Sequence, residues 1–167
     1  AGKGHGVPYR ASSVLLAYNT KTVNAPPKTL ADLLAWIKAH PGKFAYNSPK
    51  SGGSGQSFAA TVLDANMDKA AADKLRTDVD KDAMAQWDKG FAVLKSLNPS
   101  VYGKGVYPNG NSQVLELLSS GQIDMAPVWS DMFVTAKTNG QIPETVDVTQ
   151  IADPSFTGGA SYLGVAK

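Results

Sequence analysis

Cysteine is absent from this chain of 167 residues, so disulfides, thiolate metal sites and cysteine nucleophiles are excluded. No apolar run approaches the roughly 20 residues that a membrane-spanning helix needs. Residues 1–6 also lack the apolar centre of a secretory signal, so we expect either that a signal has been removed or that the chain begins inside a longer protein. With 43% apolar and 18% charged residues, the composition is that of one globular domain with a good-sized core.

An excess of one charge sign is lacking as well. Sixteen basic and fourteen acidic residues leave a net charge of +2, and these residues are scattered along the chain. A nucleic-acid-binding domain needs basic residues gathered into a patch or stripe. We therefore predict no nucleic-acid partner.

Motifs for catalysis, metals and nucleotides are missing. His5 and His40 lie far apart in sequence, and no His-x-x-x-His or His-Glu pattern occurs, so we predict no metal and no cofactor. His40 precedes a Pro-Gly helix stop and fits a solvated cap residue. No Gly-x-Ser-x-Gly with a downstream histidine occurs, and no phosphate-binding P-loop or dinucleotide motif is present. We predict that the protein is not an enzyme.

Apolar periodicity predicts alternating strands and helices. We expect strands at residues 7–19, 44–46, 123–128 and 160–165, extended chain at 101–107, and helices at 29–40, 56–63, 68–97, 111–120 and 130–137. Strands that alternate with helices favour a mostly parallel sheet with helices on both faces. The predicted fold class is α/β, a single Rossmann-like three-layer lobe.

A glycine-rich loop between a predicted strand and helix is the first candidate binding segment. It consists of Ser51, Gly52, Gly53, Ser54, Gly55 and Gln56. Glycines let backbone amides approach a ligand closely, and the following helix offers unpaired donors and a positive dipole end. The loop could hold a carboxylate or phosphate, although a Ser/Gly stretch taken alone also fits a flexible connector.

Two further candidates follow predicted strands. Asn111 and Ser112 open a helix and could offer amides and side-chain donors, or could form an ordinary N-cap turn. Trp129, Ser130 and Asp131 come directly after the strand at 123–128. The indole could stack on an organic ligand and Asp131 could pair with an ammonium or guanidinium group. Equally, Asp131 could be a helix-start acid and Trp129 a core residue.

Several stretches read together carry a family resemblance. They are residues 16–19 (Leu-Ala-Tyr-Asn), 26–36 (Pro-Pro-Lys-Thr-Leu-Ala-Asp-Leu-Leu-Ala-Trp), 41–44 (Pro-Gly-Lys-Phe), 55–58 (Gly-Gln-Ser-Phe) and 119–126 (Ser-Ser-Gly-Gln-Ile-Asp-Met-Ala). The chain resembles the second lobe of bacterial extracellular solute-binding proteins of the type II periplasmic class, which serve ABC importers.

The resemblance implies two α/β lobes joined by crossover strands, with solute trapped between them. Residues 7–18 resemble the strand that enters the second lobe and residues 159–165 the segment that leaves it. Residues 1–167 would then be one lobe with parts of the hinge, and the first lobe would be missing. The family's ligand contacts would fall on the three candidate segments. The adjacent tyrosine pair of ferric-ion binders is absent, which argues against iron.

The leading hypothesis is non-covalent capture of a small polar organic solute or anion. The implied partners are that solute, the missing first lobe and the ABC transporter permease, at a periplasmic or extracellular location associated with the membrane through the transporter. The alternative is the effector-binding domain of a cytoplasmic transcription regulator, and a third possibility is a transferase or hydrolase on a comparable scaffold. An isolated lobe would expose the face that meets its partner lobe, so we also predict self-association.

Overall fold

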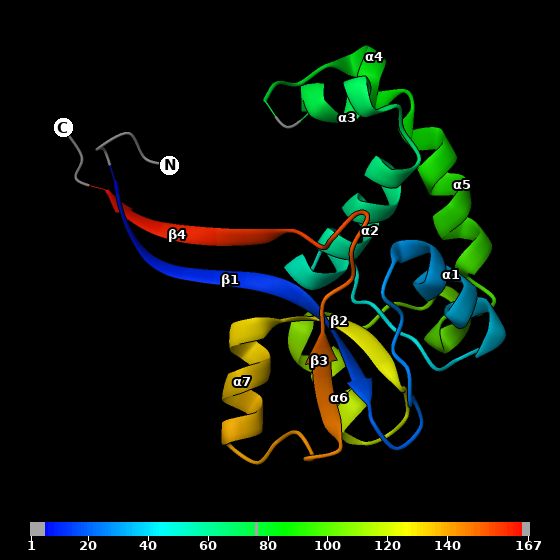
Figure 1. Cartoon of the computed structure of the whole chain (residues 1–167), viewed down its shortest axis with the longest axis vertical. Coiled ribbons are helices and arrows are strands. Elements are labelled where there is room, and N and C mark those ends of the chain that lie inside the picture. The colour runs from blue at the N-terminus through cyan, green and yellow to red at the C-terminus, as the bar shows by residue number, and fades with distance from the viewer. Residues whose placement is uncertain (1–5, 76, 165–167) are drawn as a thin grey trace.

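The computed structural model describes residues 6–75 and 77–164 as an α/β lobe from which a two-stranded ribbon projects (Figure 1). The elements are β1 (Gly6–Asn19), α1 (Leu30–Ala39), α2 (Gly53–Ala65), α3 (Lys69–Leu75), α4 (Lys81–Met84), α5 (Trp87–Leu97), the 3-10 helix η1 (Tyr102–Gly105), α6 (Asn111–Ser119), β2 (Met125–Trp129), α7 (Ser130–Thr138), β3 (Val146–Thr149) and β4 (Gly158–Gly164).

The long strand β1 organises the sheet. Its first half, from Gly6 to Ser13, pairs with β4, and its second half lies between β2 and β3. All three pairings are antiparallel, so the prediction of a mostly parallel sheet is wrong. The chain enters the lobe along β1 and runs opposite to β2. An alternation of strands and helices in sequence carries no information on that direction.

The predicted strand at residues 44–46 contributes little to the sheet. It forms a single parallel bridge, from Phe44 to Met125, although the Ala45 amide also donates to the Met125 carbonyl. Residues 44–46 therefore add one bridge to the sheet rather than a strand. β3 lies in a region where the sequence predicts no strand, and it supplies an outer strand instead.

Helices cover both faces of the sheet, as predicted, because side chains of β1 alternate between two apolar clusters. Val14 and Leu16 pack with residues of α1, α2 and α5, whereas Ala17 packs with residues of α6 and α7. In β2, Met125 belongs to the cluster of Val14 and Leu16, and Ala126 belongs to the cluster of Ala17. The period of two along each strand thus separates the core into two layers.

Local sequence signals account for the helix ends. Thr29 caps α1: its side-chain oxygen accepts the amide of Asp32 at 3.1 Å and its hydroxyl donates to the Asp32 carboxylate at 2.8 Å. The exposed His40 ends α1, as predicted, with its ring stacked on Trp36 at a centroid distance of 4.2 Å. Gly110 and Gly121 flank α6 with positive φ, a conformation that suits glycine.

Two predicted elements differ from the structure. The helix expected over residues 68–97 is divided into α3, α4 and α5. Asp80 caps α4 by accepting the amides of Asp82 and Ala83, which begins a new helix inside the expected one. The segment expected to be extended at 101–107 contains η1, with Gly103 at φ +67 and Lys104 at φ 53.

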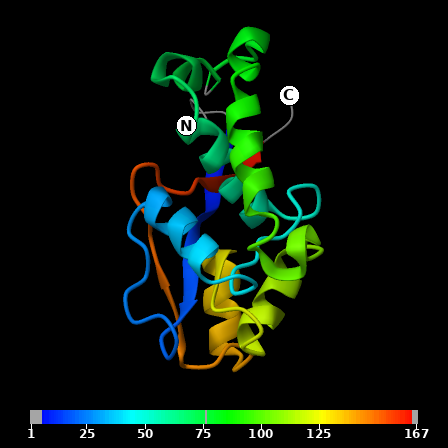
Figure 2. The same ribbon diagram turned by 90° about the vertical axis from the view of Figure 1, so that its right-hand side faces the viewer.

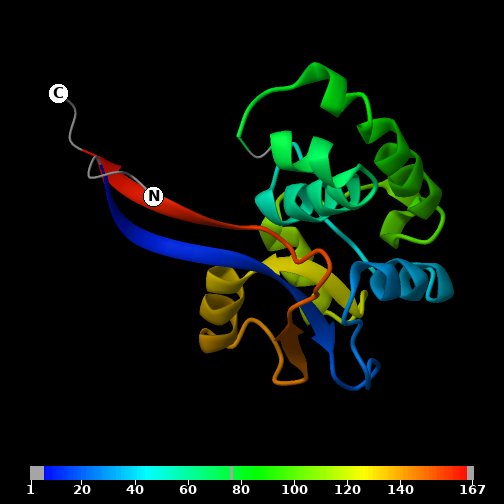
Figure 3. The same cartoon turned by 45° about the horizontal axis from the view of Figure 1, so that its top comes forward.

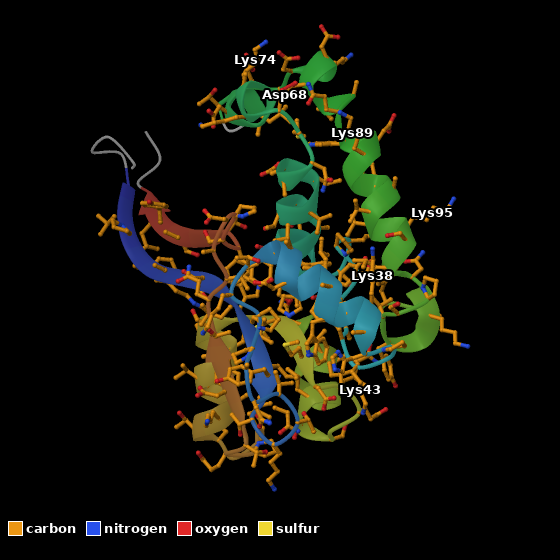
Figure 4. The ribbon with its side chains drawn as sticks, turned by 45° about the vertical axis from the view of Figure 1, so that its right-hand side comes forward. Lys38, Lys43, Asp68, Lys74, Lys89 and Lys95 are labelled. Atoms are coloured by element: carbon orange, nitrogen blue, oxygen red, sulfur yellow. The ribbon has the colours of Figure 1, made fainter. Side chains whose placement is uncertain are left out.

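The ribbon and the helical extension lie at different places on the lobe. β1 and β4 project away from the body, whereas α3, α4 and the adjoining ends of α2 and α5 form a separate extension (Figures 2 and 3). Exposed lysines of the extension and of α1, among them Lys38, Lys74, Lys89 and Lys95, lie away from the ribbon (Figure 4). Over the described residues, every helix is too short or too polar to cross a membrane.

Candidate functional site

The glycine-rich loop opens α2 and packs on Asn47. The buried Asn47 carboxamide oxygen accepts the Gly55 amide at 2.8 Å and the Ser54 hydroxyl at 2.7 Å. A Cβ at Gly55 would lie 1.8 Å from the Asn47 carbonyl oxygen, and one at Gly52 would lie 1.9 Å from Asn47 Nδ2. The glycines at these two positions therefore allow close packing against Asn47, which satisfies donors at the start of α2.

Asn111 joins the second predicted segment to the first. Its carboxamide oxygen accepts the Ser54 amide at 3.3 Å and lies 2.9 Å from the Ser54 hydroxyl. That hydroxyl has one proton, which it can give to Asn47 or to Asn111 but not to both at once. The start of α2 is thus held by two asparagine side chains, and its Ser54 and Gly55 amides already have acceptors.

Trp129 lies between the glycine-rich loop and a surface hollow. A Cβ built on Gly53 would come within 3.0 Å of Trp129 Nε1 and Cζ2, so the indole edge rests directly on the start of α2. Trp129 also packs against the apolar cluster that contains Val14 and Leu16. The side chain is therefore held in place by the lobe while part of it remains accessible.

Asp131 in the first turn of α7 forms an ion pair with Arg10 of β1. Its other carboxylate oxygen accepts the Ser12 hydroxyl at 2.6 Å. The Ser130 hydroxyl oxygen accepts the Ser13 amide at 3.2 Å and lies 3.1 Å from the Ser12 hydroxyl. This network fastens the start of α7 to the middle of β1, where the ribbon meets the lobe.

These groups surround a hollow of about 340 Å³ at the base of the ribbon. Its lining residues come from β1, α6, β2, α7 and β4: Arg10, Ser12, Asn111, Trp129, Asp131, Met132, Gly159, Ala160 and Ser161. A groove of about 540 Å³ between α6 and α7 shares Arg10, Asp131 and Met132 with it. The arrangement offers one cation, one carboxylate, hydroxyl and amide groups, and an indole, which suits non-covalent binding of a small polar solute.

The structure divides the predicted site residues into three groups. Asn111, Trp129 and Asp131 line the hollow at the ribbon. Ser112 lines the α6–α7 groove, and Ser130 supports the Asp131 network. Residues 51–56 contact Asn111 and Trp129 but line neither the hollow nor the groove. The Ser51 hydroxyl oxygen accepts the Gly110 amide at 3.0 Å.

Arg10, Ser12 and Asn47 were missed by the sequence reasoning. Arg10 is one of two arginines in the chain and stands in a predicted strand, which is a weak signal of a functional role. Nothing local distinguishes Ser12 or Asn47, because their partners lie in α7 and α2.

The histidines and carboxylates of the described residues form no group of three that could hold a metal ion. His40 lies at the exposed end of α1, and Ser54 is bonded to asparagines rather than to a base. Next to Asn47, burial raises the pKa of Tyr46 well above its ordinary value, and a hydrogen bond with Tyr107 adds to that effect. Tyr46 is therefore a neutral core residue.

Several solved structures share this fold. An extracellular solute-binding protein from Bordetella parapertussis, itself described as putative, matches with a TM-score of 0.68 at 18% identity over 99% of this chain and 46% of its own. Ferric-ion-binding protein A from Pasteurella haemolytica matches with a TM-score of 0.65 at 13% identity over 100% and 47%. MotA of A. tumefaciens B6, in complex with glucopine, matches with a TM-score of 0.60 at 26% identity over 95% and 44%.

The chain spans less than half the length of each of these three structures. No curated protein matches its sequence. The family model described as bacterial extracellular solute-binding protein matches residues 1–167, which is the whole chain. This chain therefore belongs to the bacterial extracellular solute-binding protein family.

Proposed function

We propose that this lobe is one half of the solute receptor of an ABC importer and captures a small polar organic solute without covalent chemistry. A first lobe would close over the hollow at the base of the ribbon, and the closed receptor would deliver solute to a membrane permease. The hollow of about 340 Å³ carries the proposal, because its walls come from both the ribbon and the helix starts of the lobe.

The ribbon supports this two-lobed arrangement. Its exposed apolar side chains include Val7 and Leu163, which are paired across β1 and β4 and are 67% and 63% exposed. Apolar side chains that project from a lobe suit a surface that another domain covers. The crossover strands would then join the lobes next to the hollow, so that closure and binding occur at the same place.

The family match favours this function over the effector domain of a cytoplasmic regulator, since the matched family is extracellular. Iron is disfavoured by the sequence and receives no support from the hollow, whose lining residues contain one carboxylate and no tyrosine. The structural neighbours include a protein in complex with glucopine and a periplasmic thiamin-binding protein beside ferric-ion-binding proteins, so an organic solute is a reasonable class to test.

A calorimetric screen of polar organic solutes would test the proposal. We expect weak binding by this chain and tighter binding by the two-lobed protein, because a lone lobe supplies only half of the enclosing contacts. Trp129→Ala should weaken binding in both, whereas Trp36→Ala, which alters an indole on the distant helix α1, should not. A screen in which neither form binds any solute would refute the proposal.

A further inference from the structure

Among the described residues, the charged side chains that line the hollow are a single pair of opposite sign, Arg10 and Asp131. Their side chains are 58% and 24% exposed, so both are accessible to a solute. The guanidinium group has five N–H donors and a carboxylate has about four acceptor positions, far more than one ion pair uses. Each partner therefore retains capacity for a second bond of the same kind.

The pair is held by the fold rather than by two free surface side chains. Asp131 stands in the first turn of α7, where the helix dipole stabilises a negative charge, and receives the Ser12 hydroxyl at 2.6 Å. Arg10 stands on β1, whose Ser13 amide is bonded to Ser130. The network thus fixes Asp131 against β1, and the ion pair holds the Arg10 guanidinium beside it.

The formal charge of this lining is zero, since Arg10 and Asp131 cancel. A dianion such as inorganic phosphate would meet Arg10 but also the repulsion of Asp131, and a dication would meet the reverse. A solute with a carboxylate and an ammonium group on the same carbon can satisfy both partners together. Trp129 and Met132 offer apolar surface for the rest of such a molecule.

We infer that the hollow selects zwitterionic solutes of the amino-acid type, with Arg10 binding the carboxylate and Asp131 the ammonium group. The inference rests on the proposed capture function and assigns its substrate class. The inference also places the negative group of the solute on Arg10 of β1 rather than at the start of α2, because the Ser54 and Gly55 amides already have acceptors. Ser12 and Ser130 act as positioning residues.

Three probes of matched shape would test the inference by NMR titration of this chain: L-phenylalanine, 3-phenylpropanoate and 2-phenylethylamine. They keep the ring and remove the ammonium or the carboxylate in turn. We expect each singly charged probe to bind at least about tenfold more weakly than phenylalanine, since a hydrogen bond to a charged group is lost. Inorganic phosphate should bind more weakly than phenylalanine as well.

Variants then assign the two roles. Arg10→Gln should remove the preference for phenylalanine over phenylethylamine, which lacks the carboxylate. Asp131→Asn should remove the preference for phenylalanine over phenylpropanoate, which lacks the ammonium group. Arg10→Lys should keep part of the first preference, because the charge remains. The double variant Arg10→Gln/Asp131→Asn leaves no unpaired charge and checks that the fold survives, and Lys21→Gln removes an exposed charge elsewhere. Lys21→Gln should leave both preferences unchanged.

Binding of phenylpropanoate, phenylethylamine or phosphate as tightly as phenylalanine would overturn the inference. So would unchanged preferences in the Arg10→Gln and Asp131→Asn variants. If no phenylalanine-type probe binds while another solute of the calorimetric screen does, the zwitterion assignment fails and the capture function stands. If no solute binds in either experiment, both fail.

Discussion

The two halves of the continuous strand β1 differ in their pairing and in their burial. From Leu16 to Tyr18 the strand pairs with β2 on one side and with β3 on the other, and Leu16 and Ala17 are fully buried. Before Ser12 it pairs only with β4, and Val7 and Tyr9 are 67% and 62% exposed. Buried pairing on two sides gives the second half its stability, whereas the first half depends on one ladder.

The groups of the proposed binding site lie where these halves meet. Arg10 and Ser12 come from the ribbon half of β1, and their partners Asp131 and Ser130 come from the lobe. A buried body on one side and an exposed ribbon on the other suit the hinge closure that we propose. Stability should depend mainly on the body of the molecule, and self-association should depend mainly on the ribbon.

Leu16→Ala should have the largest effect on stability. Leu16 is 0% exposed and belongs to the cluster that joins the sheet to α1, α2 and α5. We expect the free energy of unfolding to fall by about 2–5 kcal/mol, as measured by chemical denaturation. The matched change Leu163→Ala on the ribbon should alter it by no more than about 0.5 kcal/mol. Equal losses in the two variants would contradict the division.

Gly55→Ala should have the next largest effect. The new methyl group would meet the Asn47 carbonyl oxygen at 1.8 Å, so α2 or Asn47 must move. We expect a loss of roughly 1–3 kcal/mol of unfolding free energy. Gly159→Ala is the control on the ribbon, because a Cβ at Gly159 has no heavy atom within 4 Å. A Gly55→Ala protein as stable as the unchanged chain would show that this close packing is dispensable.

Alkaline pH should destabilise the lobe through Tyr46. Its pKa is raised in the folded state above the ordinary 10.0, so above about pH 10 only the unfolded state loses this proton. The unfolding free energy should then fall with a slope of at most about 1.4 kcal/mol per pH unit from this group. Denaturation across pH should show a smaller slope in Tyr46→Phe. Tyr9→Phe on the ribbon should behave like the unchanged chain.

Self-association should be the mildest effect and should depend on the ribbon. Val7 and Leu163 are opposite each other and exposed, and in the absence of another lobe they can meet a second copy. We expect light scattering to show a concentration-dependent mass that Val7→Thr/Leu163→Thr reduces. The control Val79→Thr changes a valine between α3 and α4 that is 80% exposed. A constant monomer mass at all concentrations would contradict the prediction.

Local patterns in the sequence predicted the parts of the fold that local interactions stabilise. The helices predicted at residues 29–40, 111–120 and 130–137 are present as α1, α6 and α7, because caps and helical spacing involve residues a few positions apart. The prediction of one helix over residues 68–97 is wrong, because Asp80 caps a new helix, α4, inside that range. β3 was missed because its four residues are recognisable as a strand mainly through their pairing with β1.

The candidate site was predicted in outline, and its chemistry was not. Asn111, Trp129 and Asp131 were identified as residues at strand ends and helix starts, and all three line the hollow. The role of the glycine-rich loop changed, because Gly52 and Gly55 pack against Asn47. Arg10 could not be chosen from sequence, since its partner Asp131 lies more than a hundred residues away along the chain.

The sequence by itself determined an α/β lobe, the positions of most helices and membership of a solute-binding family, because composition, periodicity and motifs are properties of the chain. Only the tertiary structure decided that the sheet is antiparallel and that Arg10 meets Asp131 at the base of the ribbon. Strand direction and the pairing of distant charges depend on how the chain returns to β1. No local interaction encodes that return.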